Sequence, residues 1–325
     1  MRFTLKSAAL TCVLSIASAS AAAADFPSRA VTIVVPYAAG GSTDVLARLF
    51  ADAMSKDLGQ PVIVENAGGA GGTIGTGKVV RAPKDGHTVL LHNMAVATAP
   101  ALYSKLGFDV AKDLDAVALL GEVPMILVRN KNFAPATLSE LTQAMKDKPG
   151  TVNFAHAGVG ATSHLCALLF SQSTGTTSTL VPYRGTGPAL LDVLAGNVDV
   201  ICDQPVATGP HIRSGALLPY AIATGERLPS LPNVPTFEEA GVKDFNLAVW
   251  HGMYVPSGTP PEVVNRLNQS VQNAMNSAEL SQRLSDMAVI PPAKAQLSPQ
   301  AAREYTEAEI KRWDPIIKAA GAKAD

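Results

Sequence analysis

The sequence predicts an α/β protein built on mostly parallel sheets, and three observations support this fold class. Short runs of β-branched and aliphatic residues, such as VTIVV at residues 31–35, are typical of buried strands. Several of these runs end in a glycine-rich turn and continue into a segment with helical spacing of apolar residues, which favours parallel strands. The chain has 325 residues, and because single cores stop growing at about 250–300 residues, we expect two domains.

The first 24 residues are predicted to be a cleaved secretory signal peptide. Arg2 and Lys6 form a basic start, residues 7–19 are small or apolar, and three alanines at 22–24 fit a cleavage site. The apolar stretch is too short to span a membrane. We therefore expect an exported mature chain of 301 residues, that is 325 minus 24.

The charge of this mature chain argues against a nucleic-acid partner. It holds 24 Lys and Arg against 27 Asp and Glu, a net charge near −3, because the two basic residues of the signal are lost. The sequence contains no cluster of basic residues that would follow a phosphate backbone, and no basic amphipathic helix that would lie on a membrane.

The stretch at residues 31–44, VTIVVPYAAGGSTD, is the first candidate site. The strand is broken by Pro36, and Gly40 and Gly41 precede an apolar helix. The first N–H groups of a helix have no partner within the helix, and the helix dipole adds partial positive charge there. The expected occupant of such a turn is an anion, for example a carboxylate.

The rest of the first half repeats this layout. A helix at 44–58 ends at Gly59, a strand at 61–64 leads into a second glycine-rich loop at 68–75, and a strand at 87–91 ends at His92. Ligands of parallel sheets lie beyond the carboxyl ends of the strands, and all three loops lie at such ends.

The second half shows the same alternation after a long apolar stretch at 117–128, which we interpret as a strand crossing between domains. Its predicted strands end in turns at three places, and a later strand returns the chain to the first domain before three closing helices. The strands are 151–155, 179–183 and 198–202, their turns are 156–164, 184–188 and 203–205, the returning strand is 246–255, and the helices are 261–277, 278–287 and 299–320.

Other motifs give weaker signals. Residues 72–78 match most of a P-loop, but Val79 stands where Mg²⁺ binding needs Ser or Thr, so the pattern does not predict a nucleotide site. Ser163, His164 and Asp203 suggest a hydrolase triad, but no nucleophile elbow is present. The histidines and cysteines lack metal-ligand spacing, so no metal is expected. For Cys166 and Cys202, a disulfide and two separately buried cysteines both stay open.

Seven stretches together carry a resemblance to one family. The sequence resembles the periplasmic substrate-binding proteins of tripartite tricarboxylate transporters, the Bug-type receptors, over almost the whole mature chain. The stretches are PYAAGGSTD at 36–44 followed by Ala47 and Arg48, QPVIVEN at 60–66, GAGGTIG at 69–75, SHL at 163–165, VPYRG at 181–185 followed by Pro188 and Ala189, LPSLPNVPT at 228–236, and SGTPP at 257–261.

The resemblance implies a two-lobed periplasmic binding protein of type II-like fold, with each lobe a mostly parallel sheet flanked by helices and two strands crossing between them. Lobe 1 is expected at 25–122 plus 248–325 and lobe 2 at 123–247. The implied function is capture of a small organic carboxylate, di- or tricarboxylate or aromatic, and its delivery to the membrane components of the transporter. A monomer without catalysis or cofactor is expected. A periplasmic hydrolase of a carboxylate ester and a ligand-sensing receptor of the same fold are the alternatives.

The resemblance also implies a ligand site between the lobes. Loops 38–43 and 69–75 hold one carboxylate, while 156–163, 184–187 and 203–204 close on the far end of a ligand whose identity stays open. Arg184 and Tyr37 depart from the family, which mostly has Lys and often Phe there. The predicted ligand-binding residues are Tyr37, Ala38, Ala39, Gly40, Gly41, Ser42, Thr43, Asp44, Gly71, Gly72, Thr73, His92, His156, Gly160, Ala161, Thr162, Ser163, Arg184, Gly185 and Asp203.

Overall fold

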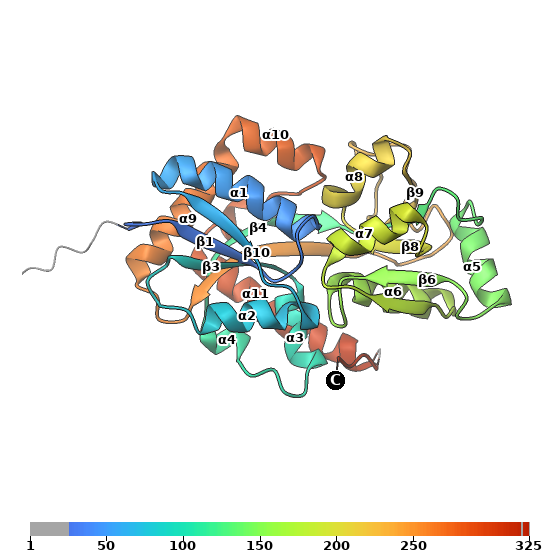
Figure 1. The fold of residues 1–325 in the computed structure, drawn as a ribbon, viewed down its shortest axis with the longest axis horizontal. Coiled ribbons are helices and arrows are strands. Elements are labelled where there is room, and N and C mark those ends of the chain that lie inside the picture. Colours follow the sequence, from blue (N-terminus) through green and yellow to red (C-terminus); the bar gives the residue numbers. More distant parts are fainter. Residues whose placement is uncertain (1–25, 320, 325) are drawn as a thin grey trace, which may run out of the picture.

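The computed structural model describes residues 26–319 and 321–324, so the predicted signal peptide lies outside the described residues. Two lobes lie side by side, and each is built on a five-stranded sheet (Figure 1). The strand order is β2-β1-β3-β10-β4 in lobe 1 and β7-β6-β8-β5-β9 in lobe 2. Both sheets are flanked by helices, which is the predicted α/β architecture.

In lobe 1, β1 pairs in parallel with β2 and β3, whereas β10 runs antiparallel to β3 and β4. Four strands therefore point one way and only β10, which arrives from the other lobe, opposes them. The strands are β1 (Val31–Val35), β2 (Val62–Asn66), β3 (Thr88–Asn93), β4 (Leu114–Pro124) and β10 (Ala248–Pro256).

Lobe 2 follows the same rule. β6 pairs in parallel with β7 and β8, and β5, which arrives from lobe 1, runs antiparallel to β8 and β9. The predicted fold class is confirmed, with one opposed strand in each sheet where the chain crosses between lobes. The strands are β5 (Ile126–Asn130), β6 (Asn153–His156), β7 (Thr179–Pro182), β8 (Val200–Asp203) and β9 (Leu217–Ile222).

The helices cover both sheets, and the last three close over lobe 1 (Figure 1). Among the described residues, no helix combines the length and apolarity needed to cross a membrane. Lobe 1 carries α1 (Ser42–Leu58), η1 (Ala70–Gly72), α2 (Thr73–Val80), α3 (Ala95–Leu102), α4 (Val110–Asp113), α9 (Pro261–Asn276), α10 (Ala278–Asp286), η2 (Lys294–Gln296) and α11 (Pro299–Ala319). Lobe 2 carries α5 (Leu138–Asp147), α6 (Thr162–Thr174), α7 (Thr186–Ala195) and α8 (Pro205–Arg213).

Helix α1 illustrates why these segments fold as they do. Its apolar residues recur at helical spacing, so Leu46, Phe50 and Met54 are buried on one face. The helix stops at Gly59, which adopts the left-handed conformation (φ +68°) that glycine tolerates and other residues rarely adopt.

The two lobes are joined where β4 continues into β5 and where the chain returns to β10. Three backbone hydrogen bonds connect these segments at the crossing. Met125 N donates to Leu247 O (2.9 Å), Leu247 N donates to Ala223 O (3.2 Å), and Ala223 N donates to Met125 O (2.8 Å). A compact joint of hydrogen-bonded strands therefore replaces a flexible linker.

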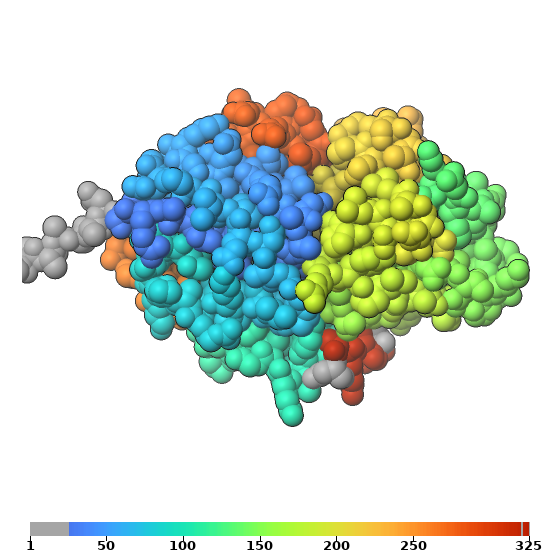
Figure 2. All heavy atoms as spheres, in the orientation of Figure 1, coloured from blue at the N-terminus to red at the C-terminus, as the bar shows by residue number. Residues whose placement is uncertain are grey.

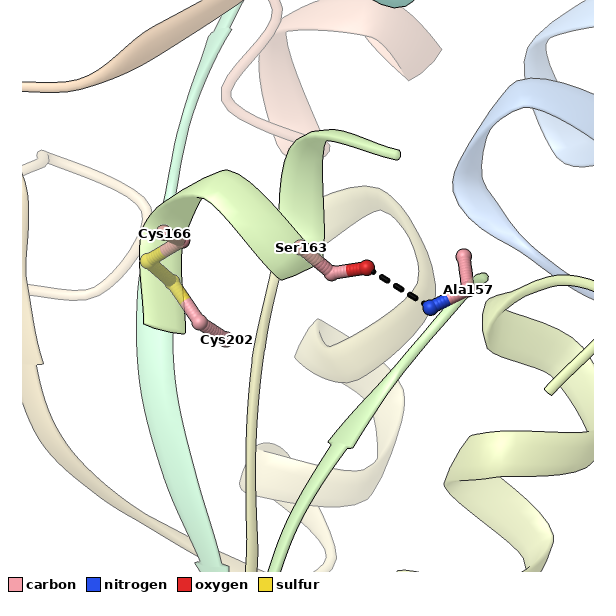
Figure 3. The surroundings of a disulfide bond; sticks show 4 residues. All are labelled: Ala157, Ser163, Cys166 and Cys202. Atoms are coloured by element: carbon pink, nitrogen blue, oxygen red, sulfur yellow. Dashed lines mark hydrogen bonds between the residues drawn. A yellow bond between two sulfur atoms is a disulfide. The ribbon is translucent and has the colours of Figure 1, made fainter. Parts of the chain in front are cut away.

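The two cysteines of the mature chain form a disulfide, which was one of the two arrangements left open by the sequence. Cys166 in α6 joins Cys202 in β8, with their Cα atoms 6.2 Å apart (Figure 3). Both residues are buried. The bond ties the first turns of α6 to the carboxyl end of β8.

The two lobes are in contact (Figure 2). Several glycines lie where their backbones meet. Ala38 N donates to Arg184 O across the interface (2.9 Å). A Cβ atom on Gly187 would lie 2.1 Å from Ala39 O, which is closer than real Cβ atoms come to such an oxygen. Glycine therefore lets the two backbones approach to contact at this point.

Candidate functional site

The turn between β1 and α1 opens toward lobe 2. Gly40 adopts a positive φ (+84°), and Gly41 is the N-cap of α1 without any side-chain cap. Ser42 and Thr43 occupy the first turn, where backbone N–H groups have no partner within the helix. The predicted glycine-rich turn before a helix is therefore present without a side-chain cap, and its binding of an anion stays a prediction.

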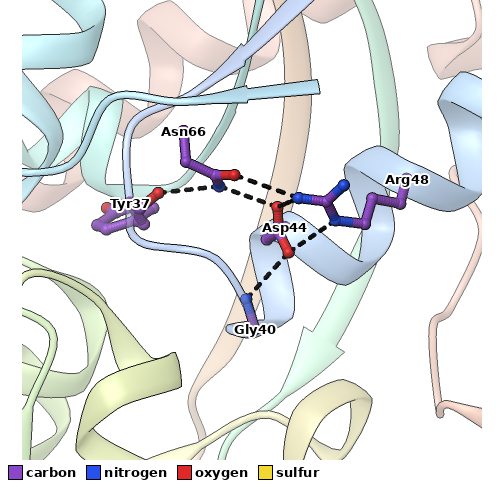
Figure 4. Close-up of polar contacts among 5 residues, drawn as sticks. All are labelled: Tyr37, Gly40, Asp44, Arg48 and Asn66. Carbon is purple, nitrogen blue, oxygen red and sulfur yellow. Dashed lines mark hydrogen bonds and ion pairs between the residues drawn. The ribbon is translucent and has the colours of Figure 1, made fainter. Parts of the chain in front are cut away.

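Asp44 stabilises this turn through hydrogen bonds of its carboxylate (Figure 4). Its carboxylate accepts hydrogen bonds from Gly40 N (3.0 Å), from Arg48 Nε and Nη2 (both 3.0 Å) and from Asn66 Nδ2 (2.9 Å). Burial by itself would raise the pKa of Asp44, but these donors outweigh it and hold the pKa below its ordinary value. The side chain is thus engaged by the protein and shapes the turn.

Four helices present their N-termini to one cavity between the lobes: α1 from lobe 1, and α6, α7 and α8 from lobe 2. None of their N-cap residues, Gly41, Ala161, Gly185 and Gln204, caps its helix with a side-chain hydrogen bond. The positive ends of four helix dipoles therefore converge on the same space, an arrangement that stabilises an anion.

The cavity is small in this structure and has room for about one water molecule. Among the described residues, those that line it include no Lys, Arg or His. The lining residues are Tyr37, Gly41, Ser42, Thr43, Asp44, Asn93, Met125, Ala157, Ala161, Thr162, Ser163, Thr186, Asp203 and Gln204. Any negative charge in the cavity is thus met by backbone dipoles and neutral donors.

Two acidic residues line the cavity: Asp44 pairs with Arg48, whereas Asp203 has no basic partner among the described residues. Its Oδ1 accepts from Ser42 Oγ of the opposite lobe (3.5 Å). Burial raises the pKa of Asp203 to about 7, although Gln204 N–H and the hydroxyls of Thr186 and Ser42 partly offset the effect. The side chain is 2% exposed and follows directly after Cys202 of the disulfide.

The histidines that the sequence singled out, His92, His156 and His164, are buried and do not line the cavity. His92 packs edge-on against Tyr37 with ring centroids 5.6 Å apart, and burial lowers its pKa to about 3. His156 and His164 pack together at 4.7 Å, and burial lowers both pKa values, that of His164 to about 4. These rings are neutral at pH 7 and add no positive charge to the site.

Nine of the predicted residues line the cavity, and the others lie around it. The lining ones are Tyr37, Gly41, Ser42, Thr43, Asp44, Ala161, Thr162, Ser163 and Asp203. The others are Ala38, Ala39, Gly40, Gly71, Gly72, Thr73, His92, His156, Gly160, Arg184 and Gly185. Direct ligand contact stays a prediction for both groups.

The second glycine-rich loop and Arg184 serve the contact between lobes. A Cβ on Gly71 would lie 2.4 Å from Val159 O of lobe 2, so this glycine permits close approach of the lobes. The Arg184 side chain is exposed, while its carbonyl accepts the hydrogen bond from Ala38. The structure therefore places these predicted residues at the contact between the lobes, outside the lining of the cavity.

Asn93 and Met125 line the cavity but were missed in the sequence. Asn93 ends β3, so the rule that ligands lie beyond the carboxyl ends of strands offered a signal for it. Met125 lies at the crossing between β4 and β5, and no local pattern marks it.

The weaker motifs have structural explanations. Lys78 of the P-loop-like stretch lies within α2 and pairs with Glu65. Ser163 Oγ accepts a hydrogen bond from Ala157 N (2.8 Å, Figure 3), and His164 Nδ1 accepts one from Gly160 N (3.3 Å). Both side chains thus support the turn between β6 and α6.

The two lobes, the crossing strands and the cavity between them define a solute-binding protein, and comparison with known proteins supplies its family. Residues 46–322 match the model of the tripartite tricarboxylate transporter family receptors, and the chain belongs to this family. The predicted family and function as a solute-binding receptor are confirmed, and the family consists of periplasmic binding proteins that form part of tripartite transporters.

Individual relatives agree with this assignment. The structure of the periplasmic binding protein BugD matches with a TM-score of 0.88 at 38% identity, covering 92% of this chain and 99% of that one. MatC from Rhodopseudomonas palustris, solved with bound malate, matches with a TM-score of 0.86 at 40% identity, covering 90% and 100%. An Agrobacterium vitis protein described as a UPF0065 protein in the TAR-I ttuE-ttuC' intergenic region is 41% identical over 296 residues, which is 91% of this chain and 86% of that protein.

Proposed function

We propose that this receptor binds a small organic carboxylate in the cavity between its lobes and delivers it to the membrane components of a tripartite tricarboxylate-type transporter. The observation that carries the proposal is the convergence of four helix N-termini without side-chain caps. Their N–H groups and dipoles suit a carboxylate. The bound malate of MatC, a protein of the same family fold, supports this ligand class.

Binding is proposed to draw the lobes together around the joint at Met125, Ala223 and Leu247. The lobes are proposed to comprise residues 25–122 with 248–325, and residues 123–247. An open half-site exchanges hydrogen bonds to a carboxylate for equally good ones to water, whereas closure excludes water and strengthens the same contacts. A ligand with contacts to both lobes therefore shifts the equilibrium toward the closed form.

The protein is proposed to perform no chemistry on its ligand and to work as a monomer in the periplasm, after removal of residues 1–24. The engagement of Ser163 and His164 with backbone N–H groups supports the absence of a hydrolase. A serine nucleophile would need a base within hydrogen-bond reach of its hydroxyl.

Native mass spectrometry of the protein as purified tests the proposal. We expect a retained small carboxylate that is recovered chemically unchanged after denaturation, and calorimetric binding of that compound to the emptied protein. Solution scattering should show a smaller radius of gyration with ligand. Recovery of a hydrolysed product, or lack of binding to any di- or tricarboxylate, would contradict the proposed function.

A further inference from the structure

Three side chains that line the ligand cavity each contain a buried polar atom without a hydrogen-bond partner among the described residues. These atoms are Thr162 Oγ1, Asp203 Oδ2 and Gln204 Oε1, in side chains that are only 2–3% exposed. Buried polar atoms in native proteins are nearly always paired, because an unpaired one loses its bonds to water without replacement. Their concentration around one cavity indicates that the ligand supplies the missing partners.

The chemistry of these atoms differs from that of the helix N-termini beside them. The helix ends donate, and a carboxylate on the ligand satisfies them. Asp203 Oδ2, when ionised, accepts only. A second carboxylate of the ligand placed against it would bring two acceptors and two like charges together. In its ionised form Asp203 therefore calls for a hydrogen-bond donor on the ligand.

When the lobes are in contact, the Asp203 carboxylate can accept a hydrogen bond from a donor on the ligand. Its Oδ1 is within reach of Ser42 Oγ from the first turn of α1, its Oδ2 has no hydrogen-bond partner among the described residues, and the residue lines the cavity. The side chain cannot turn away freely, since it is buried and the preceding residue is tied to α6 by the disulfide.

We propose that Asp203 accepts a hydrogen bond from a hydroxyl or ammonium group on the ligand, so that the receptor selects carboxylates bearing such a donor over their unsubstituted counterparts. This inference rests on the proposed function, because it assumes that the carboxylate occupies this cavity. A site built to pair with a donor rejects the analogue without it, since its own buried acceptor is then left unpaired.

The test compares matched probes by calorimetry on the full mature protein. The pairs are L-malate with succinate and 2-hydroxyglutarate with glutarate for a hydroxyl, and L-aspartate with succinate and L-glutamate with glutarate for an ammonium. We expect the wild type to bind the substituted member of at least one pair at least about tenfold more tightly. Asp203→Leu, of similar size but without an acceptor, should bring that ratio to about one.

Asp203→Asn separates the two donors. It keeps an acceptor oxygen but loses the charge, so a preference for hydroxyl should persist and a preference for ammonium should fall. Asp147→Asn, an exposed carboxylate on α5 of the same lobe, is the matched control and should leave every ratio unchanged. Thermal melting checks that each variant folds. If Asp203→Leu does not fold, the affinity ratios of the wild type and of Asp203→Asn still test the inference.

Equal wild-type affinity within every pair would overturn the inference while leaving the proposed function intact. Tighter binding of the unsubstituted acids, further improved in Asp203→Asn, would also overturn it, since Asp203 would then hold a second carboxylate through a shared proton. Binding of none of these probes would overturn the inference for four- and five-carbon acids, and binding of a longer, tri- or aromatic carboxylate would then keep the proposed function.

Discussion

Helix N-termini in this protein fall into two groups, those at the cavity and those elsewhere. Away from the cavity the helix ends are mixed: Thr137 caps α5 by accepting from Glu140 N (3.1 Å) and Ser277 caps α10 by accepting from Leu280 N (3.3 Å), whereas α2 and α9 have no side-chain cap. At the cavity, α1, α6, α7 and α8 have no such caps. A cap typically stabilises by about 1 kcal/mol, so the fold forgoes this stabilisation where a ligand is to supply the acceptor.

The largest effect is expected when an acceptor of the protein takes the ligand's place. Gly41→Asp puts a carboxylate at the N-cap of α1, and even its Cβ would lie 2.5 Å from Thr186 Oγ1. We expect binding to weaken by more than about 100-fold, or about 2.7 kcal/mol, in calorimetry. Thr137→Asp, at the cap of α5, should leave affinity unchanged, and circular dichroism should show both variants folded. Retained affinity in Gly41→Asp would show that this helix end is not the anion site.

Removal of the disulfide should have the next largest effect, because it joins α6 to the strand before α8. The double variant Cys166→Ala, Cys202→Ala should lose about 2–4 kcal/mol of unfolding free energy, measured with denaturant. A reducing agent should lower the stability of the wild type and leave the variant as it is. Titration of the denatured, unreduced mature protein should find no free thiol, and two free thiols would disprove the bond.

A smaller effect should follow from preventing contact between the lobes. In Gly187→Ala the new Cβ would lie 2.1 Å from Ala39 O. Alanine favours the helix α7, so the fold should gain about 0.5–1 kcal/mol while closure becomes harder. We expect about tenfold weaker binding, worth about 1.4 kcal/mol, and less compaction in scattering.

Gly225→Ala is the control for this variant, since nothing lies within 4 Å of a Cβ at that position. It should bind as the wild type does. Unchanged affinity and compaction in Gly187→Ala would mean that the lobes do not meet through this glycine in the bound form.

The smallest effect concerns the capped helices themselves. Thr137→Ala removes the cap of α5 and should lower the unfolding free energy by about 1 kcal/mol, seen in denaturant titration. Affinity should stay the same, because α5 lies away from the cavity. A parallel loss of affinity would break the distinction between the two groups of helix ends.

Much of this organisation could be predicted from the sequence because it depends on local patterns. The β-branched run at Val31–Val35 and the apolar spacing of α1 predicted their structures, and the turn at Gly40 and Gly41 predicted an anion site. The family stretches predicted two lobes, and the two five-stranded sheets confirm them. These features rest on residues that are neighbours in the chain.

Only the tertiary structure decided which residues meet in the cavity and in what state. Ser42 and Asp203 are 161 positions apart, and their contact depends on how the two lobes close. The neutral state of His92 and the raised pKa of Asp203 follow from burial, which is set by all the elements packed around them. Arg184, a cation in the sequence, has an exposed side chain outside the cavity lining and joins the lobes through its carbonyl. Position and solvation are properties of the packed molecule, and residue type by itself does not determine them.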